Sequence, residues 1–337
     1  MPKPDITVII DTFNYGCFIE EAIESVLSQE FGPHGVEVLV VDDGSTDDTG
    51  ERVKRFGAKI EYFRKSNGGQ ASAFNSGISR AKGDIIMLLD ADDYWLPGKV
   101  SRVLGEFNAH PGAGMVYHRW VEREMGSGRS SDADFSLISG FVPSSVRQVM
   151  SFSGLTTSCL AFRRNVLEQL LPIPDSLTIQ ADAYIGTLAT FLTPVVGLDE
   201  RLAVYRVHSR NLYSNLGGDL DPVRLRRRIA TREALVDGLS AWFKERGYNT
   251  KRGAVRATLQ RWVLLSDNDR FRLSPPGRIT FFLHLLRYNR QYRPLIKRRL
   301  HLINYLNAFG ALIVGYKYFG SLDAARERLV RWFRGGL

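Results

Sequence analysis

The stretch GDIIMLLDADDYW, residues 83–95, decides how the first half of this chain is interpreted. Ile85–Leu89 is continuously apolar, which is typical of a strand buried on both faces. Three carboxylates follow at once, at Asp90, Asp92 and Asp93. A chain seldom places that much negative charge at the end of a buried strand without a partner for it.

The residues before this strand alternate between strand and helix patterns. Strands are predicted over 6–10, 36–41, 60–63 and 85–89, and helices over 18–27 and 71–81. Apolar strands that alternate with helices indicate an α/β fold with a mainly parallel sheet flanked by helices. Further strands are expected over 113–120, 156–163 and 202–207, and mainly helices after about residue 215.

Polar clusters directly follow three of the predicted strands: Thr12–Asn14, Asp42–Ser45 and Asp90–Asp93. In an open parallel sheet, ligands bind beyond the carboxyl ends of the strands. We therefore expect the three clusters to meet at one edge of the sheet, which we call the rim.

Asp90-Ala91-Asp92 has the form of a site for a hard divalent cation, Mn²⁺ or Mg²⁺, bound through carboxylate oxygens. The simpler alternative is a solvated turn or a helix cap. The buried strand before these residues, and the two other clusters on the rim, favour the metal. The glycines after Asn67 similarly allow backbone N–H groups to approach a phosphate, although a plain loop is the alternative. No G-x-G-x-x-G or P-loop motif is present, which disfavours a nicotinamide enzyme or a P-loop ATPase.

The net charge of +9 conceals an uneven distribution. Residues 1–200 contain 17 Lys and Arg against 27 Asp and Glu, and residues 201–337 contain 28 against 9. We expect a catalytic domain over 1–215 and a basic, mainly helical region over 216–337. Basic amphipathic helices can bind an anionic membrane surface or form the solvated face of a bundle. No RNA-binding signature is present, so nucleic acid is not expected as a partner.

Compartment and membrane topology are expected to be simple. Cys17 and Cys159 have no metal-type spacing and are interpreted as two buried thiols in a reducing compartment. No secretory signal is evident, and the longest apolar segment, 302–319, is interrupted by polar residues and glycines. A cytoplasmic location follows, with peripheral attachment to the inner membrane face as an open alternative.

Four segments together resemble the family 2 inverting glycosyltransferases: ITVIIDTFNYGCFIEEAIESVLSQ, VEVLVVDDGSTDDT, NGGQASAFNSGISRAKGDIIMLLDADD and YRVH. The similarity covers roughly residues 5–210 and implies the GT-A nucleotide-diphospho-sugar transferase fold. It also implies a nucleotide-sugar donor, with a UDP-sugar favoured by family frequency, and a glycan or lipid-linked acceptor. The family usually has proline where this chain has Asp11, and often a basic residue where it has Phe74.

The resemblance also assigns roles to residues. Thr12, Phe13 and Asn14 would line the nucleobase, Asp42 would bind the base, and Asp90 would lie near the nucleoside. Asn67 would contact the nucleotide, and Asp92 would reach the metal. His208 would touch the metal or the diphosphate, or be a structural histidine. Trp95 would floor the sugar site, or pack in the core.

The general base that inverting transfer requires is assigned to Asp182, which opens a predicted helix. A helix-start carboxylate favoured by the helix dipole is the alternative. The acidic residue that usually precedes the base is replaced by Ala181, and Asp199 or Glu200 are the next candidates. The sequence thus predicts a metal-dependent inverting glycosyltransferase of polysaccharide or glycolipid assembly. Two rivals are a non-catalytic nucleotide-sugar or membrane-binding module and, less favoured, a nucleotidyltransferase.

Overall fold

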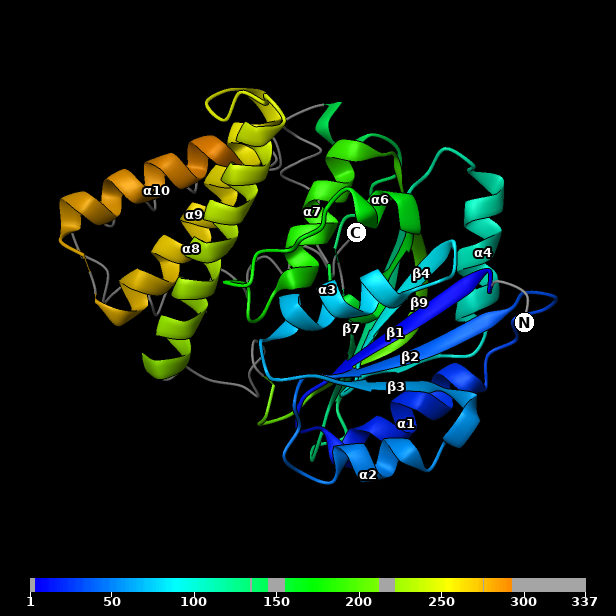
Figure 1. The fold of residues 1–337 in the computed structure, drawn as a ribbon. Coiled ribbons are helices and arrows are strands. Elements are labelled where there is room, and N and C mark those ends of the chain that lie inside the picture. Colours follow the sequence, from blue (N-terminus) through cyan, green and yellow to red (C-terminus); the bar gives the residue numbers. More distant parts are fainter. Residues whose placement is uncertain (1–3, 134, 145–154, 212–221, 275, 293–337) are drawn as a thin grey trace.

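The computed structural model describes residues 4–133, 135–144, 155–211, 222–274 and 276–292 (Figure 1). Strands and helices alternate at first, in the order β1 Ile6–Thr12, α1 Gly16–Leu27, β2 Val36–Asp42, α2 Thr49–Lys54, β3 Glu61–Arg64, α3 Gln70–Arg80 and β4 Ile85–Asp90. β1 pairs in parallel with both β2 and β4, and β2 pairs in parallel with β3. The parallel α/β arrangement predicted for this half is therefore confirmed.

The second half completes the sheet with antiparallel and parallel pairs. Its elements are β5 Tyr94–Trp95, α4 Lys99–Ala109, β6 Met115–Glu124, β7 Ser130–Asp132, β8 Leu160–Arg163, α6 Arg164–Glu168, α7 Ala181–Leu192 and β9 Val195–Val207. Three short 3₁₀ helices lie at Gly57–Lys59, Val142–Ser144 and Thr157–Cys159. The strand order is β3-β2-β1-β4-β8-β6-β9-β5, with β7 paired to β6, so the whole sheet is mixed.

Two apolar cores lie on the two faces of the sheet because side chains alternate along each strand. Ile6, Val8 and Ile10 of β1 face α1 and α4, together with alternate residues of β2 and β4. Ile9 faces the opposite way, toward α3, α6 and α7. Figure 1 shows α1 and α2 on one side of the sheet and α3 on the other.

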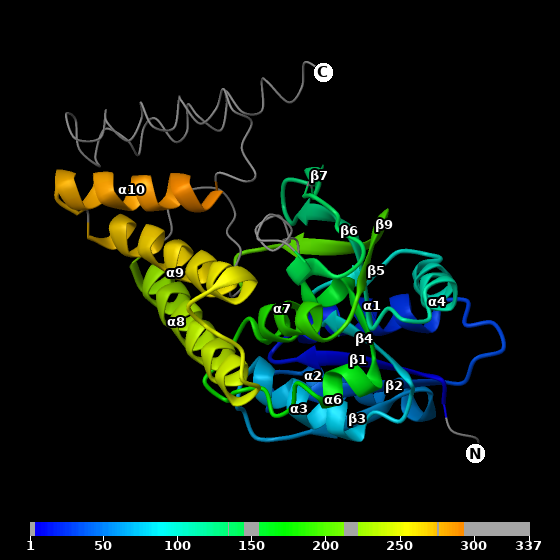
Figure 2. The same cartoon turned by 90° about the horizontal axis from the view of Figure 1, so that it is seen from above.

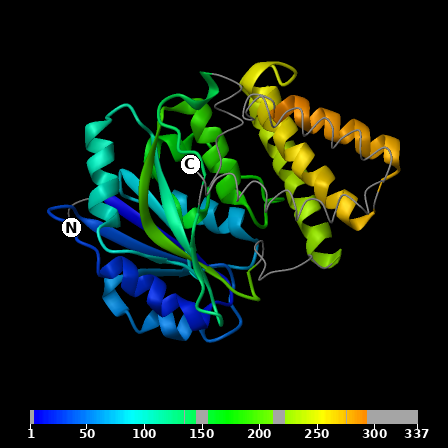
Figure 3. The same ribbon diagram turned by 180° about the vertical axis from the view of Figure 1, so that it is seen from behind.

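The described part of the C-terminal region is mainly helical as predicted, with α8 Pro222–Glu245, α9 Gly253–Leu273 and α10 Arg278–Tyr292. α8 packs against α7 through Leu235, Leu239 and Phe243, which join the core that covers α3 and α7. The three helices lie on the side of the sheet away from α4 (Figure 2, Figure 3). Within the described ranges, no helix combines the length and the apolarity needed to cross a bilayer.

Some sequence expectations change in detail or lie outside the described residues. β9 begins at Val195, seven residues before the expected strand, and Cys17 is exposed, whereas only Cys159 is buried as predicted. Cys17 lies in the first turn of α1, whose buried face is formed by other residues. The domain boundary near 215 and the apolar segment 302–319 fall on residues that the structure does not describe.

Candidate active site

Strand register brings the polar clusters of β1, β2 and β4 together at the rim. Thr12 pairs with Asp42, and Asp11 pairs with Asp90. A cavity of about 840 Å³ opens there. The predicted site residues that line it are Thr12, Phe13, Asn14, Asn67, Asp90, Asp92 and Asp182.

Asp11 and Asp90 form a pair of partly buried carboxyls, and both line the cavity. They stand opposite each other on the adjacent strands β1 and β4. Burial is the main cause that raises the pKa of both groups above the ordinary aspartate range, and the negative charge of Asp92 raises both further. Where the family usually has proline, this chain thus places an additional carboxyl on the cavity wall.

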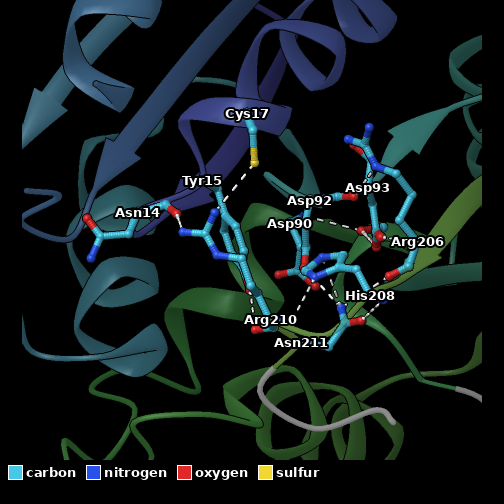
Figure 4. A network of polar contacts seen from close by, with 11 residues as sticks. Asn14, Tyr15, Cys17, Asp90, Asp92, Asp93, Arg206, His208, Arg210 and Asn211 are labelled. Carbon is cyan, nitrogen blue, oxygen red and sulfur yellow. Dashed lines mark hydrogen bonds and ion pairs between the residues drawn. The ribbon is translucent and has the colours of Figure 1, made fainter. Parts of the chain in front are cut away.

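Asp92 is held in place from the end of β9 (Figure 4). His208 Nε2 lies 3.1 Å from Asp92 Oδ2, and Asn211 Nδ2 donates to the same oxygen at 3.2 Å. The backbone N–H of Arg210 donates to His208 Nδ1. The imidazole proton is therefore on Nε2, which points at Asp92. His208 also stacks on Phe18 at 4.7 Å and does not line the cavity, so in this structure it orients Asp92.

Asp93 belongs to the same acidic cluster but serves a different purpose. Its Oδ2 accepts a hydrogen bond from the Ser158 hydroxyl at 2.5 Å, and its Oδ1 accepts one from the backbone N–H of Arg206 at 3.0 Å. The side chain is fully buried and does not line the cavity. Although Asp90, Asp92 and Asp93 lie close enough to share one metal ion, these bonds occupy Asp93 in joining the turn after β4 to the 3₁₀ helix before β8 and to β9.

The residues at the base of the cavity fit a divalent cation. The negative charges of Asp92 and Asp182 act on both Asp11 and Asp90, so these carboxyls lie close together. Asp11 Oδ1 is buried without a hydrogen-bond partner. A cation with hard oxygen ligands would offset this excess of negative charge, and Asp90 and Asp92 are the side chains that would hold it.

At the β2 end of the rim, the structure favours Asp43 over Asp42. The Asp42 carboxylate accepts the Ser45 N–H at 2.7 Å and the Tyr62 hydroxyl at 2.5 Å, and it does not line the cavity. Asp43 does line it, and accepts the Gly69 N–H at 2.6 Å and Lys65 Nζ at 2.7 Å. Alternation along β2 turns Asp42 away, so this geometry does not support the predicted contact between Asp42 and the base.

Asn14 has a positive φ of 57° and organises the loop between β2 and α2. Its Oδ1 accepts the Thr46 N–H at 2.7 Å, and its own N–H donates to Ser45 Oγ at 2.9 Å. Arg210 Nη2 donates to the Asn14 carbonyl at 2.7 Å. The Asn14 side chain, predicted to touch the nucleobase, is thus engaged in shaping the loop between β2 and α2.

Thr12, Phe13 and Asn67 also line the cavity. Phe13 is 41% exposed and so is open to a ligand in the cavity. Gly69, which follows the Asn67 turn, has a φ of +82°, and a Cβ there would lie 2.5 Å from Thr178. The backbone of this loop is therefore held close to the start of α7 by glycine.

Asp182 stands in the first turn of α7 and lines the cavity. Its Oδ2 accepts the Thr157 N–H at 3.1 Å and the Thr157 hydroxyl at 3.4 Å. Burial raises its pKa, and these bonds oppose the rise because they stabilise the ionised form. Asp199 and Glu200 are instead paired on the surface with Arg119 and Arg102, and neither lines the cavity.

Trp95 is only 3% exposed and does not line the cavity. Tyr94 and Trp95 form β5, which pairs with β9, and the Trp95 ring packs in the core that covers α1 and α4. Lys99 Nζ lies 4.0 Å from the centre of this ring. The prediction that Trp95 floors the sugar site is therefore not supported, and the core alternative describes its position.

Sequence reasoning missed several residues of the cavity. They are Asp11 and Asp43 as carboxylates, Tyr15, Gln70, Arg210 and Asn211 as polar groups, and Arg227, Arg232, Arg261 and Trp262 from α8 and α9. Asp11 directly precedes the cluster Thr12–Asn14, and Asp43 lies within the cluster Asp42–Ser45, although no separate role was assigned to it. The residues of α8 and α9 carry no local signal, since only the packing of the helices beside α7 brings them to the cavity.

Gln70 joins the two halves of the site. Its Nε2 donates to Asp90 Oδ1 and to Thr157 Oγ1, both at 3.2 Å. Its Oε1 accepts the Ala181 N–H at 2.9 Å, at the start of α7. One side chain thus links the carboxylate at the end of β4 to the turn that presents Asp182.

Gln70→Leu is expected to lower the free energy of unfolding by about 1–3 kcal/mol, because it leaves the Ala181 N–H without an acceptor in a buried position. Gln169→Leu is the matched control, since Gln169 is exposed at the end of α6 and bonds only a neighbouring carbonyl. Its change should stay within about 0.5 kcal/mol. Urea denaturation of both variants measures the difference, and equal changes would contradict the bridging role.

The fold is that of the GT-A glycosyltransferases. It matches Staphylococcus aureus TarS 1–349 in complex with UDP-GlcNAc at a TM-score of 0.56, with 17% identity over 92% of each chain. It also matches the mannosyltransferase PcManGT of Pyrobaculum calidifontis, solved with GDP-Man and Mn²⁺, at 0.53, with 18% identity over 93% of this chain and 88% of that one.

The chain belongs to glycosyl transferase family 2, whose family model matches residues 7–171. An uncharacterised glycosyltransferase of Nostoc sp. is 34% identical over 217 residues, 61% of this chain and 66% of that protein. The minor teichoic acid biosynthesis protein GgaB of Bacillus subtilis is 36% identical over 110 residues, 32% of this chain and 12% of its own length. The chain thus aligns with about two thirds of the first relative and about an eighth of the second.

Proposed function

We propose that this protein is a metal-dependent inverting glycosyltransferase, which moves a sugar from a nucleotide-diphosphate donor to an acceptor hydroxyl. One observation carries the proposal: Asp90 and Asp92, which suit a metal, and Asp182, which suits a base, line the same cavity in a family 2 chain. The cavity is large enough for a donor and part of an acceptor, since ligand pockets are typically about 300–1,000 Å³.

The donor would lie along the rim. The nucleobase would enter beside Thr12, Phe13 and Asn67, with Asp43 as the nearest carboxylate at the end of β2. Arg210 is the cationic side chain nearest the Asn14 carbonyl, and it also lines the cavity. Its guanidinium could pair with the diphosphate, because arginine matches the geometry of phosphate oxygens.

A divalent metal, when bound by Asp90 and Asp92, would neutralise the negative charge that develops on the leaving diphosphate. His208 and Asn211 would hold Asp92 in orientation, as they do in this structure. Such support fixes a carboxylate ligand before the ion arrives and reduces the cost of ordering it.

Asp182 would accept the proton of the acceptor hydroxyl. Thr157 holds its carboxylate through two bonds to one oxygen. Burial raises its pKa, which makes it a stronger base than an exposed aspartate, and those bonds oppose the rise because they stabilise the ionised form. Attack from the face opposite the leaving diphosphate would invert the anomeric centre.

A UDP-sugar is the donor we favour, with a role in polysaccharide or glycolipid assembly. TarS binds UDP-GlcNAc, PcManGT binds GDP-Man, and GgaB takes part in teichoic acid biosynthesis, which supports this class without fixing the donor. The two-domain division at residue 215 and a cytoplasmic location are part of the same proposal.

Peripheral attachment to an anionic membrane is a further part of it. Ile279 and Leu283 of α10 are 70% and 47% exposed beside a basic region, which suits a membrane surface. Flotation should favour phosphatidylglycerol vesicles over neutral ones and weaken with salt. Equal flotation with both kinds of vesicle would contradict the attachment.

Donor turnover separates this function from a non-catalytic sugar-nucleotide module. UDP-, GDP- and dTDP-sugars are tested in a thermal-shift panel with and without Mn²⁺ or Mg²⁺, since ligand binding raises the apparent stability. Hydrolysis of the stabilising donor is then followed without acceptor. We expect one nucleotide class to stabilise the protein in a metal-dependent way and to be hydrolysed slowly. Stabilisation without any turnover, in hydrolysis or transfer, would favour the non-catalytic module.

A further inference from the structure

The basic C-terminal region contributes a wall to the cavity, although its charge was expected to serve a different partner. Arg227 and Arg232 reach the cavity from α8, and Arg261, Trp262 and Leu265 reach it from α9. These side chains share one cavity with Asp182 and the rim carboxylates. We call this group of five residues the basic wall.

Four arginines and one carboxylate lie in or next to the basic wall. Asp269 accepts Arg232 Nη1 at 2.6 Å and lies 3.1 Å from Arg228 Nε, so two guanidinium groups share one carboxylate. Arg227 and Arg261 add two more positive charges. The cavity is therefore acidic at the rim and basic on the side of α8 and α9, which is a layout that separates two kinds of ligand group.

The basic wall adjoins α7, the helix that presents Asp182 to the cavity. Arg261 and Trp262 border a small hollow together with Thr187 of α7. Thr187 follows Asp182 by five residues, which is about 7.5 Å along a helix axis at a rise of about 1.5 Å per residue. An anionic group bound by Arg261 would thus lie about one sugar or polyol unit from the hydroxyl that Asp182 serves.

We propose that the acceptor is an anionic glycan or polyol chain, with phosphate or carboxylate groups beside the accepting hydroxyl, and that the basic wall binds those groups. The inference rests on the proposed function and names its acceptor class. Arginine binds phosphate and carboxylate through paired hydrogen bonds, which fixes orientation as well as affinity. A membrane surface fits this part of the protein less well, because these arginines line a concave cavity and a bilayer is flat.

The test uses a glycerol-phosphate oligomer as the anionic probe and dextran as the neutral one, with the full chain and no donor. Wild-type protein should bind the oligomer in a salt-sensitive manner and should not bind dextran. The double variant Arg227→Gln/Arg261→Gln should bind the oligomer at least about tenfold more weakly, since two charge-assisted contacts are lost. Arg226→Gln is the matched control, because Arg226 is exposed on α8 and does not line the cavity. It should stay within about twofold of wild type.

Three results would overturn the inference: equal binding of oligomer and dextran, equal weakening by the control substitution, or loss of phosphatidylglycerol vesicle binding in the double variant with oligomer binding intact. The last result would assign these arginines to a membrane. Nucleotide affinity, measured in parallel, shows that the double variant is folded. Failure of the proposed function would appear separately, as absence of metal-dependent nucleotide binding in wild-type protein that still binds the oligomer.

Discussion

Asp92→Ala is expected to reduce metal-dependent turnover of the donor by at least about 10²–10³-fold, the usual effect of removing a group that stabilises charge in the transition state. His208 and Asn211, which follow β9, hold the Asp92 carboxylate in place at the rim. It lines the cavity with Asp90, whereas Asp93 is occupied by Ser158 and Arg206. Metal affinity should therefore fall with turnover.

The readout has to separate loss of metal from loss of fold. Asp92→Asn keeps the shape and removes one negative charge from a cluster in which that charge raises the pKa of Asp11, Asp90 and Asp93. In chelator, its thermal midpoint is expected at or above that of wild type, while the stabilisation by Mn²⁺ with nucleotide is lost. Asp132→Asn, a surface carboxylate paired with Arg201, is the control and should keep both properties. Full turnover in Asp92→Ala would rule out the metal assignment.

The rim could be predicted because it follows from strand ends alone. Parallel strands place their carboxyl ends at one edge, so Thr12, Asp90 and their neighbours had to converge once the strands were recognised. The register confirms this, with Thr12 beside Asp42 and Asp11 beside Asp90. The position of Asp182 in the same cavity also agrees with the sequence, although its role as base stays a prediction.

The side-chain directions at the rim could not be predicted from the motifs. Asp42 and Asp43 are adjacent in sequence, but only Asp43 lines the cavity, because Asp42 ends β2 and is held by Ser45 and Tyr62, whereas Asp43 stands in the turn after the strand. Trp95 lies two residues after the aspartates, yet the two-residue strand β5 turns it into the core. Phe74 stands where relatives often have a basic residue, and it is completely buried on the core face of α3.

The contributions of distant segments needed the structure. Gln70 looked like part of a turn, and its bonds to Asp90, Thr157 and Ala181 depend on contacts far apart in the chain. The basic wall depends on how α8 and α9 pack beside α7 and the site. A charge count identified that region as basic, but it gave no indication that some of the charge faces the same cavity as the acidic cluster.

Asp182→Asn is expected to reduce transfer to an acceptor by roughly 10²–10⁴-fold, the usual contribution of a positioned general base. The substitution keeps the shape of the side chain and removes its basicity. Donor and metal affinity should change little, since the base acts on the acceptor. Asp199→Asn is the control: Asp199 is 77% exposed and pairs with Arg119 away from the cavity, so its transfer rate should match wild type. A parallel loss of donor affinity and transfer in Asp182→Asn would indicate a structural role instead.

The pH dependence gives an independent test of the same residue. The base must be ionised to act, so transfer should fall as the pH falls through the pKa of Asp182. Burial raises this pKa, and therefore the acidic limb should lie above that of an exposed aspartate. The Thr157 hydroxyl opposes the rise by stabilising the ionised carboxylate. Thr157→Val should raise the pKa further and move the acidic limb to higher pH, while the rate on the alkaline plateau changes less. If the limb does not move in this variant, or persists in Asp182→Asn, it reports another group and the base lies elsewhere.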